Sequence, residues 1–230
     1  METIAVILPA AGAGLRLGAE RPKQFLPLGG KLLLLYSLER FLQMEDVSSV
    51  AMALPALGFD AYRNEVSRLC DSPRLTLLPG GSTRQESVAQ ALEHVSREIR
   101  WVAIHDVARP FFSRRLFERV WEAARETGAA IPGIEVADTI KEVDSQGRVV
   151  STIDRGRLRR VQTPQVFSQD LLRRCVALAQ RDGWTVTDDA MLLERSGYCV
   201  QMVPGLEENI KITSAQDYQW AEQWIRTTSE

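Results

Sequence analysis

Short apolar runs alternate with amphipathic stretches along the first two thirds of the chain. The apolar runs are brief and rich in branched residues, which predicts β-strands. They cover Ile4–Leu8, Val50–Leu54, Leu75–Leu78, Trp101–Ile104 and Ala129–Ile131. The amphipathic stretches predict helices and cover Leu33–Leu42, Ala61–Leu69, Gln85–Val95 and Arg115–Arg125. This alternation predicts an α/β fold, with a Rossmann-like, mostly parallel sheet and helices on both faces.

The pattern changes near residue 137. Thr139–Val143 and Arg148–Ile153 predict two strands, and the turn residues between them, at 144–147, predict a β-hairpin. An isolated two-stranded ribbon is only marginally stable in water, so we expect an arm over about residues 137–156 that leans on a second subunit or on its own domain. The chain, residues 1–230, is expected to form a single domain that carries this protruding arm.

Composition and charge exclude several classes of protein. The 28 basic and 30 acidic side chains give a net charge of −2, which indicates no general affinity for nucleic acid or an anionic membrane. Cys70, Cys175 and Cys199 are odd in number and far apart, which indicates neither a disulfide framework nor a zinc site. No apolar run approaches the roughly 20 residues of a membrane span, and the N-terminal run is too short for a signal peptide. We therefore expect a soluble, cytoplasmic protein.

A loop rich in glycine and alanine follows the first predicted strand. It reads PAAGAGLRLG at residues 9–18 and is followed by PKQ at residues 22–24. Small residues let backbone N–H groups approach phosphate oxygens. Arg16 adds a guanidinium, which can bind two oxygens at once, and Lys23 adds an ammonium, which is a compact positive charge. The dinucleotide fingerprint would need glycine where Leu17 stands, and the P-loop pattern is absent. The alternative is a tight turn with two solvated cations.

A second glycine motif follows the third predicted strand. Gly80 and Gly81 end that strand, and Ser87 lies near the start of the next helix. A backbone amide and a hydroxyl in these places can recognise the edge of a base. A plain glycine turn before a helix is the alternative. Two interpretations of Arg84 stay open: it forms an ion pair with an acid, or it lies at the rim of a nucleotide site.

Asp106 follows the predicted strand Trp101–Ile104. Ligands of open α/β sheets bind beyond the carboxyl ends of the strands, where one carboxylate can hold Mg²⁺ over a triphosphate. Alternatively, Asp106 caps the helix that begins near Ser113 or pairs with Arg109. His105 is interpreted as a structural neighbour.

The motif P-A-A-G-x-G-x-R-x-G, followed by P-K-Q-F-L-P-L, resembles the signature of the sugar nucleotidyltransferases, in particular of the 2-C-methyl-D-erythritol 4-phosphate cytidylyltransferase family. Further matching segments extend almost to the C-terminus. They are GGSTRQESV at 80–88, HDVARP at 105–110, DTIK at 138–141, QTPQ at 162–165, TDDA at 187–190 and NIKIT at 209–213. The resemblance implies transfer of CMP from CTP to a sugar-alcohol phosphate, with release of pyrophosphate, in isoprenoid precursor biosynthesis.

The resemblance also implies a role for each matching residue. The nucleotide-binding positions are Ala10, Ala11, Gly12, Ala13, Gly14, Gly81 and Ser87. The catalytic positions are Arg16, Lys23, Arg155 and Lys211. The positions for the second substrate are Asp106, Arg109, Thr139, Thr163 and Thr187, with Asp106 also the ligand of Mg²⁺. Taken alone, Arg155 is interpreted as part of a solvated basic face. A basic face of this kind can bind RNA, but no aromatic residues lie among its arginines for bases to stack on, so RNA binding is not indicated.

Thr139 and Arg155 flank the predicted hairpin, so the resemblance implies a homodimer in which the arm of a partner subunit completes the site. A phosphate oxygen of the second substrate would attack the α-phosphorus of CTP without a covalent intermediate or a general base. Arg16, Lys23 and Mg²⁺ would stabilise the charge that develops. Two alternatives stay open, a ribitol 5-phosphate cytidylyltransferase and a non-catalytic nucleotide-binding protein.

Overall fold

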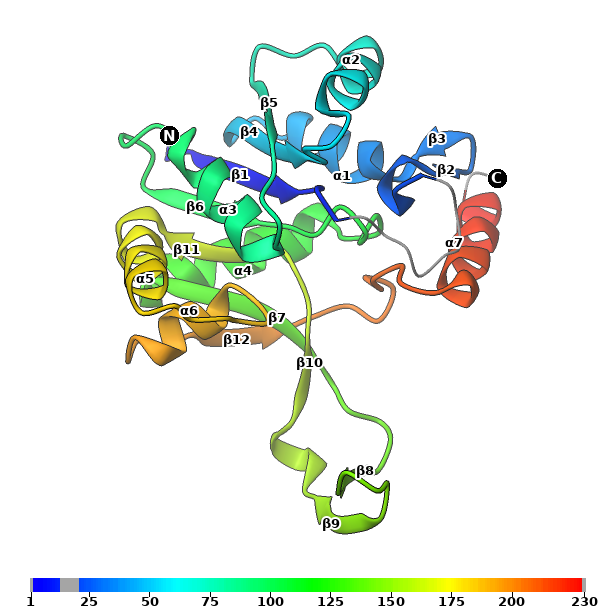
Figure 1. The fold of residues 1–230 in the computed structure, drawn as a ribbon, viewed down its shortest axis with the longest axis vertical. Helices are drawn as coiled ribbons and strands as arrows, with labels where there is room; N and C mark the ends of the chain where they lie inside the picture. The colour runs from blue at the N-terminus through cyan, green and yellow to red at the C-terminus, as the bar shows by residue number, and fades with distance from the viewer. Residues whose placement is uncertain (1, 13–20, 229–230) are drawn as a thin grey trace.

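A computed structural model describes residues 2–12 and 21–228 (Figure 1). Its main sheet has the strand order β10-β7-β11-β6-β1-β4-β5, with β12 beside β7. The strands are β1 (Ile4–Pro9), β4 (Val47–Leu54), β5 (Leu75–Pro79), β6 (Trp101–Ile104), β7 (Ala129–Glu135), β10 (Arg159–Val161), β11 (Gln165–Ser168) and β12 (Gln201–Pro204). β6, β1, β4 and β5 are parallel, whereas β11 enters antiparallel between β6 and β7. The predicted α/β class is confirmed, and every strand predicted from an apolar run is present.

Helices cover both faces of the sheet, as predicted. They are α1 (Leu33–Leu42), α2 (Phe59–Leu69), α3 (Arg84–Glu93), α4 (Arg114–Thr127), α5 (Gln169–Arg181), α6 (Ala190–Arg195) and α7 (Ala215–Thr228). In β1, Val6 and Leu8 belong to the core cluster that includes residues of α1, α2 and α4, whereas Ala5 and Ile7 belong to the cluster with α3, α5 and α6. Side chains alternate across a strand, so an unbroken apolar run supplies both cores.

A smaller layer lies beside α1. The short strands β2 (Pro27–Leu28) and β3 (Lys31–Leu32) pair antiparallel, and α7 packs over them through Ala221. Ile212, just before α7, is buried in the same cluster. Within residues 2–12 and 21–228, no helix has both the length and the apolar character needed to cross a bilayer.

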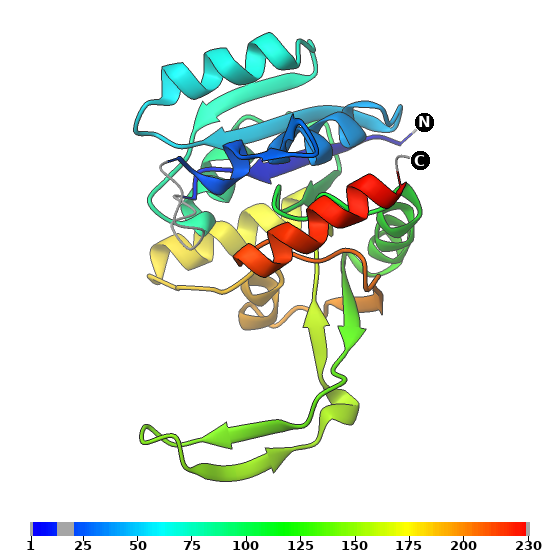
Figure 2. The same cartoon turned by 90° about the vertical axis from the view of Figure 1, so that its right-hand side faces the viewer.

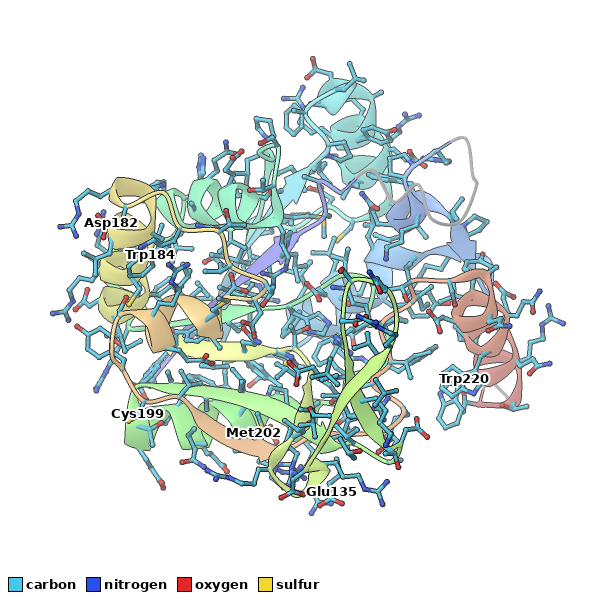
Figure 3. All side chains as sticks on the ribbon, turned by 60° about the horizontal axis from the view of Figure 1, so that its bottom comes forward. Glu135, Asp182, Trp184, Cys199, Met202 and Trp220 are labelled. Atoms are coloured by element: carbon cyan, nitrogen blue, oxygen red, sulfur yellow. The ribbon has the colours of Figure 1, made fainter. Side chains whose placement is uncertain are left out.

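The predicted arm is present and projects from the body. β8 (Ile140–Val143) and β9 (Val149–Ile153) pair antiparallel, and Gly147 in the turn has φ of 79°, a conformation that glycine adopts without strain. The arm leaves the sheet where β7 ends at Glu135, labelled in Figure 3, and returns through β10 (Figure 2). Both views in Figures 1 and 2 show it extending away from the domain. The alternative of a hairpin folded onto its own domain is therefore wrong for this chain.

Candidate active site

A cleft of about 600 Å³ lies at the carboxyl ends of β1, β5 and β6. Parallel strands bring the loops that follow them to one edge of the sheet. The loop after β1, the start of α3, Asp106 and Lys211 all line this cleft. The structure therefore brings together segments from four distant parts of the chain.

The loop after β1 is anchored at its base. The Ala10 N–H donates to the Ala53 carbonyl at 2.7 Å. The buried amide of Gln24 donates to the carbonyls of Ala10 at 2.5 Å and Gly12 at 2.8 Å. Gln24 lies in the PKQ segment, but its role was not predicted. Ala13, Gly14 and Arg16 lie outside the described residues.

Lys23 begins the short 3-10 helix Lys23–Phe25 and lines the cleft. Its ammonium donates to the carbonyl of Ile212 at 2.6 Å. This bond ties the first loop to the segment that carries Lys211. The two predicted catalytic lysines, Lys23 and Lys211, thus both line one cleft.

Gly81 and Ser87, the two positions predicted to recognise a base, also line the cleft, where they bond to each other. The Gly81 N–H donates to Ser87 Oγ at 3.1 Å, and the Ser87 hydroxyl donates to the Thr83 carbonyl at 2.9 Å. Thr83 caps α3 by accepting a bond from Glu86 N. Gly80 is required by close packing, since a Cβ there would stand 2.3 Å from Ala11 Cβ.

Asp106 stands between two cations. Its Oδ1 accepts a bond from Arg84 Nε at 3.0 Å, and its Oδ2 accepts one from Lys211 Nζ at 2.7 Å. Burial alone would raise the pKa of Asp106, but the charges of Arg84 and Lys211 hold it well below its usual range. The side chain is therefore a carboxylate at any physiological pH. Of the two alternatives, the helix cap is wrong, because Ser113 itself caps α4.

Arg84 joins Asp106 to a second, buried acid. Its Nη2 lies 2.7 Å from Oδ2 of Asp189. Burial alone would lower the pKa of Arg84, but the charges of Asp189 and Asp106 raise it above its usual value. Burial raises the pKa of Asp189. The ion pair predicted as one alternative for Arg84 is confirmed, and Arg84 also lines the cleft. The role of Asp189 was not predicted, although it belongs to the matching segment TDDA.

A second cleft, of about 380 Å³, adjoins the first. It is lined by Arg109, Thr163 and Thr187, three of the residues that the resemblance assigned to the second substrate. Burial lowers the pKa of Arg109, whose Nη1 donates to the Asn209 carbonyl at 2.8 Å. The second cleft shares one wall with the first, and that wall consists of Arg84, Asp106 and Lys211. Ligands in the two clefts would therefore contact the same three charged groups.

Thr139 and Arg155 lie elsewhere. Both are exposed on or beside the arm and line neither cleft. The Arg155 guanidinium contacts the carbonyl of Ala137, at the root of the arm. A single chain therefore does not bring these two residues to the site, and their roles stay predictions.

Asp106 is the acidic side chain among the described residues that line the first cleft, and it could contribute to a metal site there. No group of three or more histidine, cysteine or acidic side chains in the described part of the chain is placed to hold an ion. Mg²⁺ commonly binds through one or two carboxylates together with substrate phosphates and water. Asp106, ionised and lining both clefts, meets this requirement.

Comparisons with known proteins find similar sequences over almost the whole chain. A family model described as 2-C-methyl-D-erythritol 4-phosphate cytidylyltransferase matches residues 4–227. A protein of that name from Solibacter usitatus is 39% identical and covers 97% of this chain and 96% of its own length. Another from Symbiobacterium thermophilum is 41% identical and covers 95% and 91%.

Solved structures are similar over nearly the same span. The crystal structure of 2-C-methyl-D-erythritol 4-phosphate cytidylyltransferase from Thermus thermophilus matches with a TM-score of 0.79 and 39% identity, over 98% of this chain and 100% of that one. The crystal structure of a 4-diphosphocytidyl-2C-methyl-D-erythritol synthase from Anaerococcus prevotii matches with a TM-score of 0.85 and 26% identity, over 98% of this chain and 99% of that one. The fold and the sequence therefore indicate the same family.

Proposed function

Since the chain belongs to the 2-C-methyl-D-erythritol 4-phosphate cytidylyltransferase family, we propose that it transfers CMP from CTP to 2-C-methyl-D-erythritol 4-phosphate and releases pyrophosphate. The product is 4-diphosphocytidyl-2-C-methyl-D-erythritol, an isoprenoid precursor. The observation that carries this proposal is the wall of Arg84, Asp106 and Lys211 between the two clefts. Two phosphorylated substrates, one in each cleft, would meet at that wall.

In this assignment, CTP occupies the larger cleft. The loop after β1 would present backbone N–H groups to its phosphates, with Lys23 and Arg16 as cations. Gly81 and Ser87 would border the cytosine. The sugar phosphate occupies the second cleft, beside Arg109, Thr163 and Thr187.

The reaction is an in-line displacement at the α-phosphorus of CTP. A phosphate oxygen of the second substrate forms the new bond to the α-phosphorus, and the bond between the α-phosphorus and the α–β bridging oxygen breaks, so pyrophosphate leaves with the bridging oxygen. A phosphate dianion is already a nucleophile at neutral pH, so no general base is required. Lys23 and Lys211 would neutralise negative charge on the two sides of the reacting phosphorus, which is where such a reaction gains most from fixed positive groups.

A divalent metal ion is generally required in nucleotidyl transfer, and we propose Mg²⁺ held by Asp106. When bound, Mg²⁺ supplies charge neutralisation at the triphosphate. The residues Arg84 and Lys211 would keep Asp106 ionised for that purpose.

A homodimer would complete the site. Thr139 and Arg155 lie outside both clefts of their own chain, and Val143, Val149 and Val150 on the arm are 54 to 62% exposed. Apolar side chains on a thin ribbon gain stability when another surface covers them. We therefore propose that the arm packs against a partner subunit and presents Arg155 to its second cleft.

The free thiols Cys70, Cys175 and Cys199 suit a reducing cytoplasm.

The test is release of pyrophosphate with CTP, UTP or ATP as donor and with each of two acceptors. We expect a higher kcat/KM with CTP and 2-C-methyl-D-erythritol 4-phosphate than with any other pair. A preference for ribitol 5-phosphate would assign the alternative acceptor within the same chemistry. No pyrophosphate with any pair would refute the proposal and favour a nucleotide-binding protein.

A further inference from the structure

His105 is a buried polar residue for which the mechanism above has no use. Its side chain is 0% exposed and packs against the rings of Phe41 and Phe112, whose centroids lie 5.4 and 4.3 Å from its own. It directly precedes Asp106, at the end of β6. Both ring nitrogens nevertheless have polar partners, Thr163 Oγ1 at 3.0 Å from Nδ1 and the Arg109 carbonyl at 3.1 Å from Nε2.

The partners determine where the protons lie. A carbonyl oxygen can only accept, so the imidazole Nε2 carries the hydrogen that it donates to Arg109. A ring that carries its one hydrogen on Nε2 offers a lone pair at Nδ1, 3.0 Å from the Thr163 hydroxyl, which has a hydrogen to donate. The Thr163 hydroxyl therefore donates to His105 Nδ1, and its oxygen accepts the bond from the Asp106 N–H at 3.0 Å.

We propose that His105 is a positioning residue, which fixes the Thr163 hydroxyl so that Thr163 in turn holds the backbone of Asp106 at the wall between the clefts. This inference rests on the proposed function. The hydrogen-bonded chain runs from Asp106 N–H through Thr163 and His105 to the Arg109 carbonyl. It joins the loop after β6 to the segment before β11.

The same chain changes the expected role of Thr163. Its hydroxyl hydrogen is committed to His105, so it is not free to donate to a substrate phosphate. The Thr163 carbonyl is also engaged, since it accepts a bond from Asn209 Nδ2 at 2.9 Å. Thr163 thus serves the second cleft by holding Asp106 in place, while Arg109 and Lys211 supply the charges that a phosphate would meet.

A spectroscopic experiment tests the proton arrangement without any turnover. The chain has 2 histidines, and His94 is exposed at the end of α3, so ¹⁵N resonances of the two rings can be assigned with the single variant His94→Gln. We expect His105 to show a protonated Nε2 and an unprotonated Nδ1, and the Asp106 amide to exchange slowly with solvent. A hydrogen on Nδ1 of His105 would overturn the proposal, and this result is independent of whether the enzyme acts on CTP.

Kinetics test the consequence for catalysis. His105→Asn keeps an amide oxygen near the position of Nδ1, whereas His105→Leu removes the acceptor. We expect kcat of His105→Leu to fall by about 10- to 100-fold while the KM for CTP changes little, because a small displacement of a catalytic group acts on the transition state. His105→Asn should recover most of that loss, and His94→Gln should match the wild type.

A second pair of variants covers the case in which His105→Leu does not fold. Thr163→Ser keeps the hydroxyl, and Thr163→Val removes it, so the valine variant should lose far more turnover than the serine variant and should show faster exchange at the Asp106 amide. Since the two residues form one unit, the double variant His105→Leu/Thr163→Val should lose no more than the worse single variant. Equal turnover of Thr163→Ser and Thr163→Val, or losses that multiply, would overturn the proposal. An inactive wild type would refute the proposed function alone.

Discussion

Lys211 Nζ lies 2.7 Å from Oδ2 of Asp106, although 105 positions separate the two residues in the chain. Arg84 holds the other oxygen of the same carboxylate at 3.0 Å. A phosphate that enters either cleft therefore meets cations that already have an anionic partner. Substrate binding must share these cations with Asp106, which makes the position of Asp106 important for both substrates.

The ion pairs of Asp106 predict a pH dependence of stability. Its pKa is depressed in the folded protein, so ionised Asp106 stabilises the fold above the unfolded-state pKa of about 4, and this contribution is lost as the pH falls toward the folded-state pKa. Asp106→Asn lacks the contribution. The difference in unfolding free energy between wild type and Asp106→Asn should be constant above about pH 5 and should shrink below about pH 4.

Urea unfolding from pH 7 to pH 3 measures this difference. Asp60→Asn serves as the control, because Asp60 lies on the surface of α2 with its side chain 81% exposed. The control should differ little from the wild type over the whole range. A difference for Asp106→Asn that stays flat to pH 3 would contradict the assigned ion pairs.

Lys23→Ala should fold but lose turnover. Removal of a preorganised cation typically costs on the order of 10² to 10³ in rate, and we expect at least that loss in kcat. Lys31→Ala is the matched control, since Lys31 pairs with Glu39 away from both clefts. Near wild-type turnover of Lys23→Ala in a steady-state pyrophosphate assay would remove Lys23 from the catalytic set.

Arg155→Ala should mainly impair use of the sugar phosphate, because the arm is proposed to reach the second cleft of a partner. We expect kcat/KM for the sugar phosphate to fall by about 10-fold or more while the KM for CTP changes little. Arg148→Ala, near the tip of the arm, is the control, since Arg148 pairs with Asp144 in the same turn. An effect confined to CTP binding would mean that the two substrate roles are misassigned.

Mixing two defective subunits tests whether the arm acts in trans. In a heterodimer of Arg155→Ala and Lys23→Ala, one of the two sites would contain neither substitution. Random pairing after co-expression should restore about a quarter of the wild-type activity, since half the dimers are mixed and each has one intact site. Activity no higher than that of the single variants would show that Arg155 acts within its own chain.

Two glycines at or beside the larger cleft should respond differently to alanine. A Cβ at Gly80 would stand 2.3 Å from Ala11 Cβ, so Gly80→Ala should lower the unfolding free energy by about 1–3 kcal/mol. A Cβ at Gly12 meets no atom of the described residues within 4 Å, so Gly12→Ala should keep its stability but raise the KM for CTP, because the methyl group occupies the approach to the backbone. Denaturant unfolding and CTP kinetics on both variants check the contrast. Equal stability losses would contradict it.

Local patterns predicted the elements that bury a regular apolar face. The predicted helix Leu33–Leu42 agrees with α1 at both ends, and the strand Trp101–Ile104 agrees with β6. β4 begins at Val47, three positions before the predicted start, because Ser48 and Ser49 interrupt the apolar run although both lie within the strand. β11 was not predicted, since a four-residue strand that begins with Gln165 has no local signature and depends on pairing with β6 and β7.

At the site, too, some residues were predicted from the sequence and others were not. Motif order indicated the loops, and the carboxyl ends of the strands indicated which edge of the sheet they share. Lys23, Asp106 and Lys211 were predicted at the site and line the larger cleft. Gln24, Asp189 and the hydrogen-bonded chain through His105 were not predicted, because each depends on partners far away in the sequence.

The amino-acid sequence alone therefore determined the periodicity of the strands and helices, the hairpin arm and the chemical types of the residues at the cleft. Those features depend on neighbours within a few positions. Only the tertiary structure decided that Arg84, Asp106 and Lys211 form one wall between two clefts, and that Thr139 and Arg155 lie away from it in the same chain. Ion pairs and buried hydrogen bonds are made across the fold, so their partners are determined by packing rather than by local sequence.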